Sequence, residues 1–238
     1  MRNKYEVVTF DVGNTLVRVD PFERMFRKAC DRLGVPMSDL AMKNALDGVW
    51  GEVWAQDAYA VTDASPEGNR AWWRAVNVRT LRLAGLPKSS WPAVEEEFNT
   101  ILEDPAEYSV YPDALPTLVA LRQDGYRLGA VSNWGWCLPD LCQAWGFADH
   151  LDFVVASARV GFAKPNPRIF REALRTARVL SEQMLHVGDS HRADVLGARG
   201  AGIDAVLVDR QGNDPHDDCV VVRSLAGVPL LLAQAESA

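Results

Sequence analysis

The stretch Val7–Val17, VVTFDVGNTLV, decides the fold of this chain. Its first part is a β-branched and apolar run, which is typical of a buried strand in a parallel sheet. The run reaches Asp11, and a Gly-Asn-Thr turn follows at once. Ligands of open parallel sheets bind beyond the carboxyl ends of the strands. Asp11 therefore stands where an enzyme of this class would place a nucleophile.

Helix and strand patterns alternate in the second half of the chain. Strands are predicted over 126–133, 153–157, 183–190, 204–209 and 219–224, with helices over 112–125, 137–146, 167–179, 192–202 and 228–235. This alternation indicates right-handed βαβ units and a parallel sheet covered on both faces. The predicted fold class is α/β, with a Rossmann-like parallel sheet as its core.

An all-helical segment interrupts this pattern. It has no strand signal, and start and stop residues predict four helices over 20–34, 38–59, 65–85 and 90–104. We expect residues 1–18 and 108–238 to form the α/β domain, and residues 19–107 to form an inserted four-helix domain.

Composition and charge exclude several classes of protein. The net charge is -7 and the chain contains no cluster of lysines or arginines. The sequence therefore gives no indication of the basic surface that binds nucleic acid or an anionic membrane. No apolar run approaches the length of a membrane span or a signal peptide. The cysteines Cys30, Cys137, Cys142 and Cys219 form no C-x-x-C pair and have no nearby histidines that complete a zinc pattern. We expect buried thiols in a cytoplasmic protein.

Four short segments resemble the ordered motifs of the haloacid dehalogenase (HAD) superfamily. They are FDVGNTL around Asp11, VSN at 131–133, AKPNPRIF around Lys164, and HVGDSHRAD at 186–194. The resemblance extends over essentially the whole chain, including a helical cap inserted just after the first motif. It implies a magnesium-dependent hydrolase, most similar to the phosphatase-like branch, acting on a small phosphorylated molecule.

The same resemblance assigns roles that the residue types can perform. Asp11 would be a carboxylate nucleophile that forms a covalent intermediate, and Lys164 would neutralise its charge. The phosphate would be bound by Asn133, by the hydroxyls of Thr15 and Ser132, and by backbone N–H groups of Gly13 and Asn14.

A magnesium site is implied at the same end of the sheet. Its expected ligands are Asp11, the carbonyl of Gly13 and Asp189, with Asp194 as a further acid that supports them. His191 follows two residues after Asp189, and a loop histidine is more often structural than catalytic.

Gly13 departs from the phosphatase pattern, which has a second aspartate at this position. Glycine supplies a carbonyl and an N–H group, but it cannot protonate a leaving alcohol or activate water. General acid–base assistance of that kind contributes about 10²–10⁴ in rate. We therefore expect metal and phosphate binding to survive and proton transfer to be missing.

The sequence is also compatible with functions other than a phosphatase. They are a phosphotransferase, a phosphonoacetaldehyde-hydrolase-like C–P hydrolase using Lys28 or Lys43, and a catalytically weak ligand-binding protein. The paired acids Asp189 and Asp194 argue against a metal-free 2-haloacid dehalogenase. Trp134 and Trp136 follow the second motif directly, where they could form an aromatic wall for a substrate.

Overall fold

The computed structural model describes residues 4–55, 64–212 and 216–237. These residues form two compact units, one of Met1–Arg18 with Ser109–Ala238 and the other of Val19–Tyr108. The second unit ends at Tyr108, one residue later than the sequence predicts. Tyr108 Oη donates a hydrogen bond to the carbonyl of Leu102 at 2.8 Å, which ties it to the helical unit.

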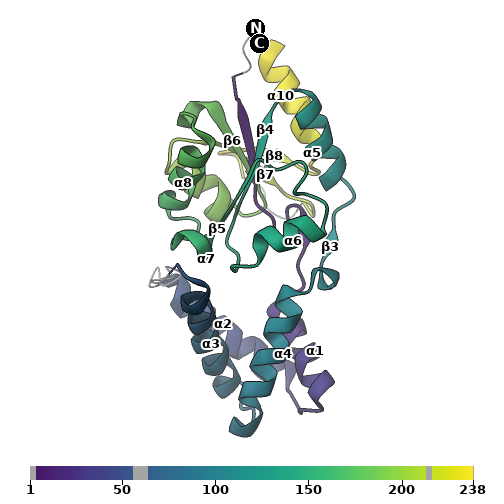
Figure 1. Ribbon diagram of the computed structural model, residues 1–238, viewed down its shortest axis with the longest axis vertical. Helices are drawn as coiled ribbons and strands as arrows, with labels where there is room; N and C mark the ends of the chain where they lie inside the picture. Colours follow the sequence, from purple (N-terminus) through teal and green to yellow (C-terminus); the bar gives the residue numbers. More distant parts are fainter. Residues whose placement is uncertain (1–3, 56–63, 213–215, 238) are drawn as a thin grey trace. The chain divides into compact units, whose positions relative to one another are not determined.

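The first unit is built on one parallel sheet, which confirms the predicted fold class. Its order is β5-β4-β1-β6-β7-β8, with all neighbours parallel. Figure 1 shows these strands at the centre of the unit. The strands are β1 (Val7–Phe10), β4 (Arg127–Ser132), β5 (Phe153–Ala156), β6 (Met184–Gly188), β7 (Asp204–Val208) and β8 (Val220–Val222). Because β1 lies between β4 and β6, the segments that follow these three strands are neighbours.

Helices cover both faces of this sheet. In Figure 1, α5 (Ala114–Gln123) and α10 (Gly227–Ser237) lie on one side and α8 (Pro167–Ala177) lies on the other. Shorter helices are α6 (Leu138–Ala144), α7 (Ser157–Val160) and α9 (Gly197–Arg199). The sequence predicts one α-helix over 192–202. The structure instead has a π-helical turn, η4 (His191–Leu196), before α9.

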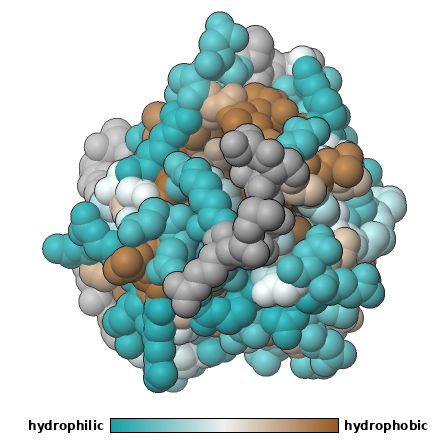
Figure 2. Space-filling view, turned by 90° about the horizontal axis from the view of Figure 1, so that it is seen from above, coloured by the Kyte–Doolittle hydropathy of each residue, from teal (hydrophilic) through white to brown (hydrophobic). Residues whose placement is uncertain are grey.

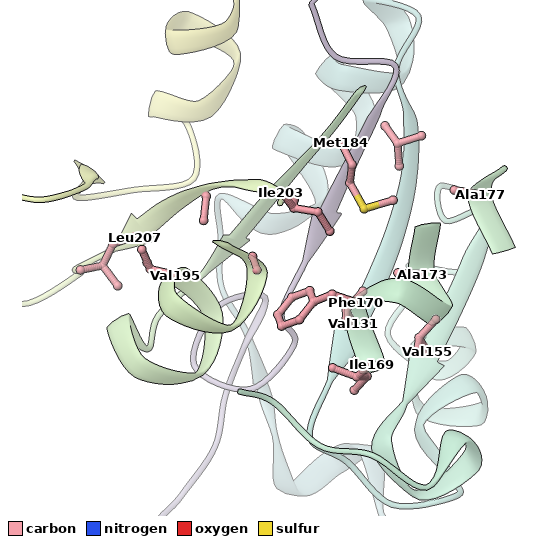
Figure 3. Close-up of a cluster of buried hydrophobic side chains, with 13 residues drawn as sticks. Val131, Val155, Ile169, Phe170, Ala173, Ala177, Met184, Val195, Ile203 and Leu207 are labelled. Carbon is pink, nitrogen blue, oxygen red and sulfur yellow. The ribbon is translucent and has the colours of Figure 1, made fainter. Parts of the chain in front are cut away.

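The core beneath α8 joins the sheet to the candidate site. Figure 3 shows Ile169 and Phe170 of α8 in one buried cluster with Val131 of β4, Val155 of β5 and Val195 of η4. Burying a side chain of this size contributes about 1.5–3 kcal/mol. The edge of the Phe170 ring also meets His186, with ring centroids 5.0 Å apart and planes at 80°. A buried histidine thus borders this apolar cluster.

A small antiparallel ladder marks the point where the second unit is inserted. Strand β2 (Val17–Arg18) pairs with β3 (Ser109–Val110), and the partners are Val17 with Val110 and Arg18 with Ser109. The chain therefore leaves and re-enters the α/β unit at adjacent positions. Two-residue strands are too short to show a periodic pattern, so the sequence does not predict them.

The second unit consists of the four predicted helices. They are α1 (Phe22–Leu33), α2 (Asp39–Ala55), α3 (Pro66–Leu83) and α4 (Trp91–Glu103), with short turns η1 (Lys88–Ser90) and η2 (Pro105–Glu107). Helix α1 has Pro21 at its N-cap and ends at Gly34 in a left-handed conformation, φ 65°. Phe26 and Phe98 stack with ring centroids 3.9 Å apart, so α1 and α4 share an aromatic core. The expected continuation of α2 over 56–59 lies outside the described residues.

The face of the molecule drawn in Figure 2 is mainly polar. On the face drawn in Figure 2, hydrophilic residues predominate and hydrophobic ones form separate groups. Exposed large apolar side chains include Leu40, Leu180 and Leu230. Within the described residues, none of the helices is both long enough and apolar enough to cross a membrane.

Candidate active site

Within the part of the chain that the structure describes, Asp11 is anchored through one of its two carboxylate oxygens. It follows β1, and its backbone N–H donates to the carbonyl of Val187 at 2.8 Å. Ser132 Oγ and Lys164 Nζ both donate to Asp11 Oδ1, at 2.8 and 2.6 Å. Among the described residues, none donates a hydrogen bond to Oδ2. The carboxylate is thereby held in one orientation with its second oxygen available to react.

Lys164 is a buried cation between two acids. Its Nζ lies 2.6 Å from Asp11 Oδ1 and 2.6 Å from Asp194 Oδ1, and its side chain is only 2% exposed. Burial alone would lower the pKa of Lys164, but the two carboxylates raise it above its usual value. The ammonium therefore stays charged. It has three N–H donors, and two of them serve the acids.

Asp194 is held by protein donors on both oxygens. Oδ1 accepts from Lys164 Nζ and from His186 Nε2, the latter at 3.0 Å, and Oδ2 accepts from the backbone N–H of Ser190 at 3.0 Å. Burial would raise the pKa of Asp194, but Lys164 and His186 outweigh it and keep the pKa well below its usual range. Because both of its oxygens already accept hydrogen bonds, Asp194 is better suited to position the neighbouring residues than to coordinate a metal ion directly.

His186 is a site residue that the sequence analysis does not identify. It is fully buried in β6, and its Nδ1 lies 3.0 Å from Thr9 Oγ1. Because an ionised carboxylate only accepts hydrogen bonds, Nε2 carries the proton that faces Asp194. The one available signal was a polar side chain inside an apolar strand, MLHVG. A chain of contacts thus runs from Thr9 through His186 and Asp194 to Lys164.

Gly188 makes room for Asp194. A Cβ atom at Gly188 would overlap the carboxylate carbon and Oδ2 of Asp194 and would lie 2.6 Å from its Cβ. Real Cβ atoms essentially never lie within 3.0 Å of another non-bonded heavy atom. The glycine of the GDS segment is therefore required for the position of the buried acid.

Asp189 adds a third carboxylate to this site. Ligand atoms of Asp11, Asp189 and Asp194 all lie within 4.8 Å of one another. Burial, together with the charges of Asp11 and Asp194, raises the pKa of Asp189 to about 8. Lys164 therefore does not fully compensate the negative charge of the three acids. Oxygen ligands and an excess of buried negative charge suit a hard divalent cation such as Mg²⁺, so these residues fit the ion.

The turn after Asp11 is ordered by its own backbone. Asn14 has φ 55°, and its N–H donates to the carbonyl of Val17 at 2.6 Å, so this donor does not face a phosphate as the sequence predicts. Thr15 is fully buried, and its Oγ1 has no hydrogen-bond partner among the described residues. Because Thr15 has no exposed surface, its hydroxyl is not accessible to a ligand in this conformation. Gly13 is partly exposed, and among the described residues its N–H has no acceptor.

Asn133 positions Lys164. Its Nδ2 donates to the carbonyl of Lys164 at 2.9 Å, and its Oδ1 accepts from the N–H of Lys164 at 2.7 Å. The sequence predicts a contact between Asn133 and the substrate. The structure uses both polar atoms of the side chain to hold the backbone of the lysine instead.

Arg210, two residues beyond the end of β7, supports the turn that follows Asp11. This residue was not predicted from the sequence. Its Nη2 donates to the carbonyl of Thr15 at 2.7 Å, and its guanidinium makes a bidentate pair with Asp113 at 2.9 and 3.0 Å. Tyr111 packs against the guanidinium, 3.7 Å from the ring centroid. The turn is thus tied to two later segments of the chain.

The two tryptophans expected near the substrate are partly buried. Trp134 meets Trp145 edge to face, with centroids 5.9 Å apart, and Arg159 lies over Trp136 at 5.0 Å. Both rings therefore have protein neighbours. The aromatic wall stays a prediction.

Comparisons with known proteins show the family of this chain. A family model described as haloacid dehalogenase-like hydrolase matches residues 5–202. The chain belongs to the haloacid dehalogenase-like hydrolases. It is 32% identical over 223 residues to mouse haloacid dehalogenase-like hydrolase domain-containing protein 3, covering 92% of this chain and 87% of that one. It is also 32% identical over 200 residues to the phosphoserine phosphatase of Thermus thermophilus, covering 82% and 74%.

Solved structures show the same fold. An HAD phosphatase from Thermococcus onnurineus superposes with a TM-score of 0.67 at 25% identity, covering 95% of this chain and 97% of that one. A 2-haloacid dehalogenase from Pseudomonas syringae gives a TM-score of 0.71 at 24% identity, covering 97% and 99%. The fold thus serves both phosphatases and dehalogenases, and the side chains must distinguish between them.

Proposed function

We propose that this HAD-like hydrolase is a Mg²⁺-dependent phosphatase that acts on a small phosphorylated metabolite through an aspartyl phosphate at Asp11. The observation that carries the proposal is the one-sided anchoring of Asp11, whose Oδ1 accepts from Ser132 and Lys164 while Oδ2 is left to attack. A carboxylate fixed in this way loses little orientational freedom on reaching the transition state. Phosphatases among the relatives support the same substrate class.

The first step is an attack of Asp11 Oδ2 on phosphorus. An O–P bond forms to the carboxylate and the bond from phosphorus to the leaving oxygen breaks, so the phosphoryl group moves to Asp11. The third N–H of Lys164 and the N–H of Gly13 would donate to the phosphoryl oxygens. Water then attacks phosphorus, which releases inorganic phosphate and regenerates the carboxylate.

Asp11, Asp189 and the Gly13 carbonyl would hold the cation, and Asp194 would orient this set. When bound, Mg²⁺ supplies positive charge that offsets the charge of the phosphate and of the acids. The chain's own contribution is to keep Lys164 protonated and Asp194 ionised. Both follow from their mutual contact at 2.6 Å.

The glycine at position 13 shapes the expected substrate range. No carboxyl group at this position can protonate the departing oxygen, so aryl and acyl phosphates, whose leaving groups need little protonation, should react best. Hydrolysis of the aspartyl phosphate should be slow for every substrate. A long-lived phosphorylated enzyme is the direct consequence.

The C–P hydrolase alternative is disfavoured by the two lysines it would need. A Schiff base requires an uncharged amine. Lys28 pairs with Glu107, and Lys43 pairs with Asp47 at 2.7 Å. The hydrogen bond that Lys43 Nζ donates to Asp47 raises the pKa of Lys43, which stabilises the protonated amine.

The test is turnover of p-nitrophenyl phosphate with Mg²⁺ and with EDTA, using wild type, Asp11→Asn and the exposed control Asp149→Asn. We expect Mg²⁺-dependent activity in wild type and in the control, and none in Asp11→Asn. Mass spectrometry after quenching should find one phosphoryl group on the peptide that contains Asp11. Activity that persists in Asp11→Asn would disprove the mechanism.

A further inference from the structure

A second cluster of metal-binding side chains lies in the α/β unit. It consists of His191, the first residue of η4, and Asp218 and Cys219, which directly precede β8. One ligand atom from each of these residues lies within 4.8 Å of the others. None of the three belongs to the carboxylate cluster around Asp11. The two clusters are separate sets of side chains.

The spacing of His191 and Asp218 suits coordination of a metal ion. His191 Nε2 lies 3.0 Å from Oδ1 and 3.1 Å from Oδ2 of Asp218. With Zn–N and Zn–O bonds of about 2.0–2.2 Å in a tetrahedral arrangement, two donor atoms stand roughly 3.3 Å apart. An ion can therefore replace the shared proton with only a small movement of either side chain.

Neighbouring residues hold this pair in place before any ion binds. Arg199 Nη1 donates to Asp218 Oδ2 at 3.0 Å, and its Nη2 donates to the carbonyl of Asp218 at 2.5 Å. His216 stacks on His191 with ring centroids 3.6 Å apart and planes at 4°. A metal ion lies in the plane of the imidazole that binds it, so a parallel ring does not reach the same ion. His216 therefore fixes the ring of His191 and covers one face of it.

The donor set selects a different ion from the one at Asp11. One imidazole nitrogen, one carboxylate oxygen and one thiol sulfur are ligands that suit Zn²⁺ and Co²⁺, whereas Mg²⁺ prefers oxygen alone. Cys219 is not part of a disulfide and is partly exposed. On binding, its thiol proton is released to solvent, because the thiolate is the ligand.

We propose that His191, Asp218 and Cys219 form a binding site for a borderline transition metal ion such as Zn²⁺, with a fourth position open to water. The sequence shows no zinc pattern because His191 lies 28 positions before Cys219 and the cysteines form no C-x-x-C pair. The fold brings the three side chains together, because η4 contacts β7 and β7 pairs with β8.

The site also bears on the loop that carries Asp189. Only Ser190 stands between Asp189 and His191, and two residues span at most about 7 Å. An ion bound at His191 therefore restrains the backbone next to the predicted magnesium ligand.

Co²⁺ is the probe that tests the proposal, since a cobalt–thiolate bond gives a charge-transfer band that carboxylates do not produce. Wild-type protein saturated with Mg²⁺ is titrated with Co²⁺. We expect one equivalent to bind with a thiolate band, and Cys219→Ser to lose that band. His191→Gln should weaken binding at least about tenfold, because one ligand of three is displaced.

Two control variants separate this site from other sources of the band. Cys137→Ser removes another partly exposed thiol and should keep the band, as should Asp189→Asn, which alters the carboxylate cluster. Thermal melts confirm that each variant is folded. A wild type without the band, a band that survives in Cys219→Ser, or a band lost in Asp189→Asn would each overturn the proposal.

Discussion

Replacing Lys164 by methionine should destabilise the protein strongly, because it removes the cation from a group of buried acids. Lys164 Nζ lies 2.6 Å from a carboxylate oxygen on either side, and the side chain is 2% exposed. At an effective dielectric constant of about 20, each pair attracts by roughly 6 kcal/mol before solvation is counted. Desolvation of the ammonium offsets several kcal/mol of this sum.

The net loss is set by what remains in the variant. Asp11 and Asp194 would stay buried without their counter-charge, and breaking a buried pair in this way typically costs about 3–5 kcal/mol. For a chain of this size, 1 kcal/mol corresponds to roughly 2–4 °C in melting temperature. We therefore expect Lys164→Met to melt about 6–20 °C lower than wild type in EDTA. Saturating Mg²⁺ should restore part of the loss, since it binds the folded state.

The assay is thermal and urea unfolding with and without Mg²⁺, with the exposed Lys88→Met as the matched control. A double-mutant cycle with Asp194→Asn separates charge from packing. If the acids are the cause, Asp194→Asn should be less harmful in the Lys164→Met background than alone. A loss in EDTA equal to that of Lys88→Met, or costs that simply add in the cycle, would refute the reasoning.

Three further changes test other parts of the site. Gly188→Ala should cost about 1–3 kcal/mol and abolish phosphatase activity, because its Cβ would overlap Asp194; unaltered melting would contradict this. Gly13→Asp should raise alkyl phosphate turnover by about 10²–10⁴, and it meets no backbone strain, since Gly13 is not among the described glycines with positive φ. Unchanged turnover would mean that another group already transfers the proton. Burial alone would raise the pKa of Asp113. The hydrogen bonds from Arg210, Ser224 and Leu225 outweigh this effect, and the pKa of Asp113 lies below its ordinary value of 3.8. The stability from this pair is present above pH 3.8 and is lost as pH falls through the lower, folded-state pKa, so acid unfolding below pH 4 should be less steep in Arg210→Gln than in wild type.

The fold was largely predictable from the sequence, because its signals are local. Cap residues such as Ser65 and stop residues such as Gly34 gave the ends of α1, α3 and α4 to within one or two residues. Alternating apolar strands and amphipathic helices gave the parallel sheet. The π-helical turn at 191–196 was not predictable, since its apolar positions fit an α-helix equally well.

The candidate site was predictable to a smaller extent. Asp11, Ser132 and Asp189 stand at the ends of strands or just beyond them, so the topology predicts that they lie at the same edge of the sheet. Lys164 and Asp194 were expected there from the resemblance of their motifs. The contacts of these residues bring them together. The contacts of other residues depend on side-chain positions that no spacing specifies.

Asn133 shows this limit. It sits at the predicted place but bonds to the backbone of Lys164. His186 and Arg210 were missed for a related reason. Some of their partners lie far away in the chain. A single histidine or arginine in a sequence does not indicate which carboxylate or carbonyl group it will contact in the folded protein.

The ladder between β2 and β3 makes the helical unit an exchangeable module. Arg18 and Ser109 are cross-strand partners, so the ends of the insert are already as close as the two arms of a hairpin. A turn of two residues could connect them, and closing so short a loop costs far less entropy than ordering 90 residues. Every side chain of the carboxylate site belongs to the other unit. Nature or an engineer can therefore replace what lies between Arg18 and Ser109 and leave the chemistry of Asp11 in place.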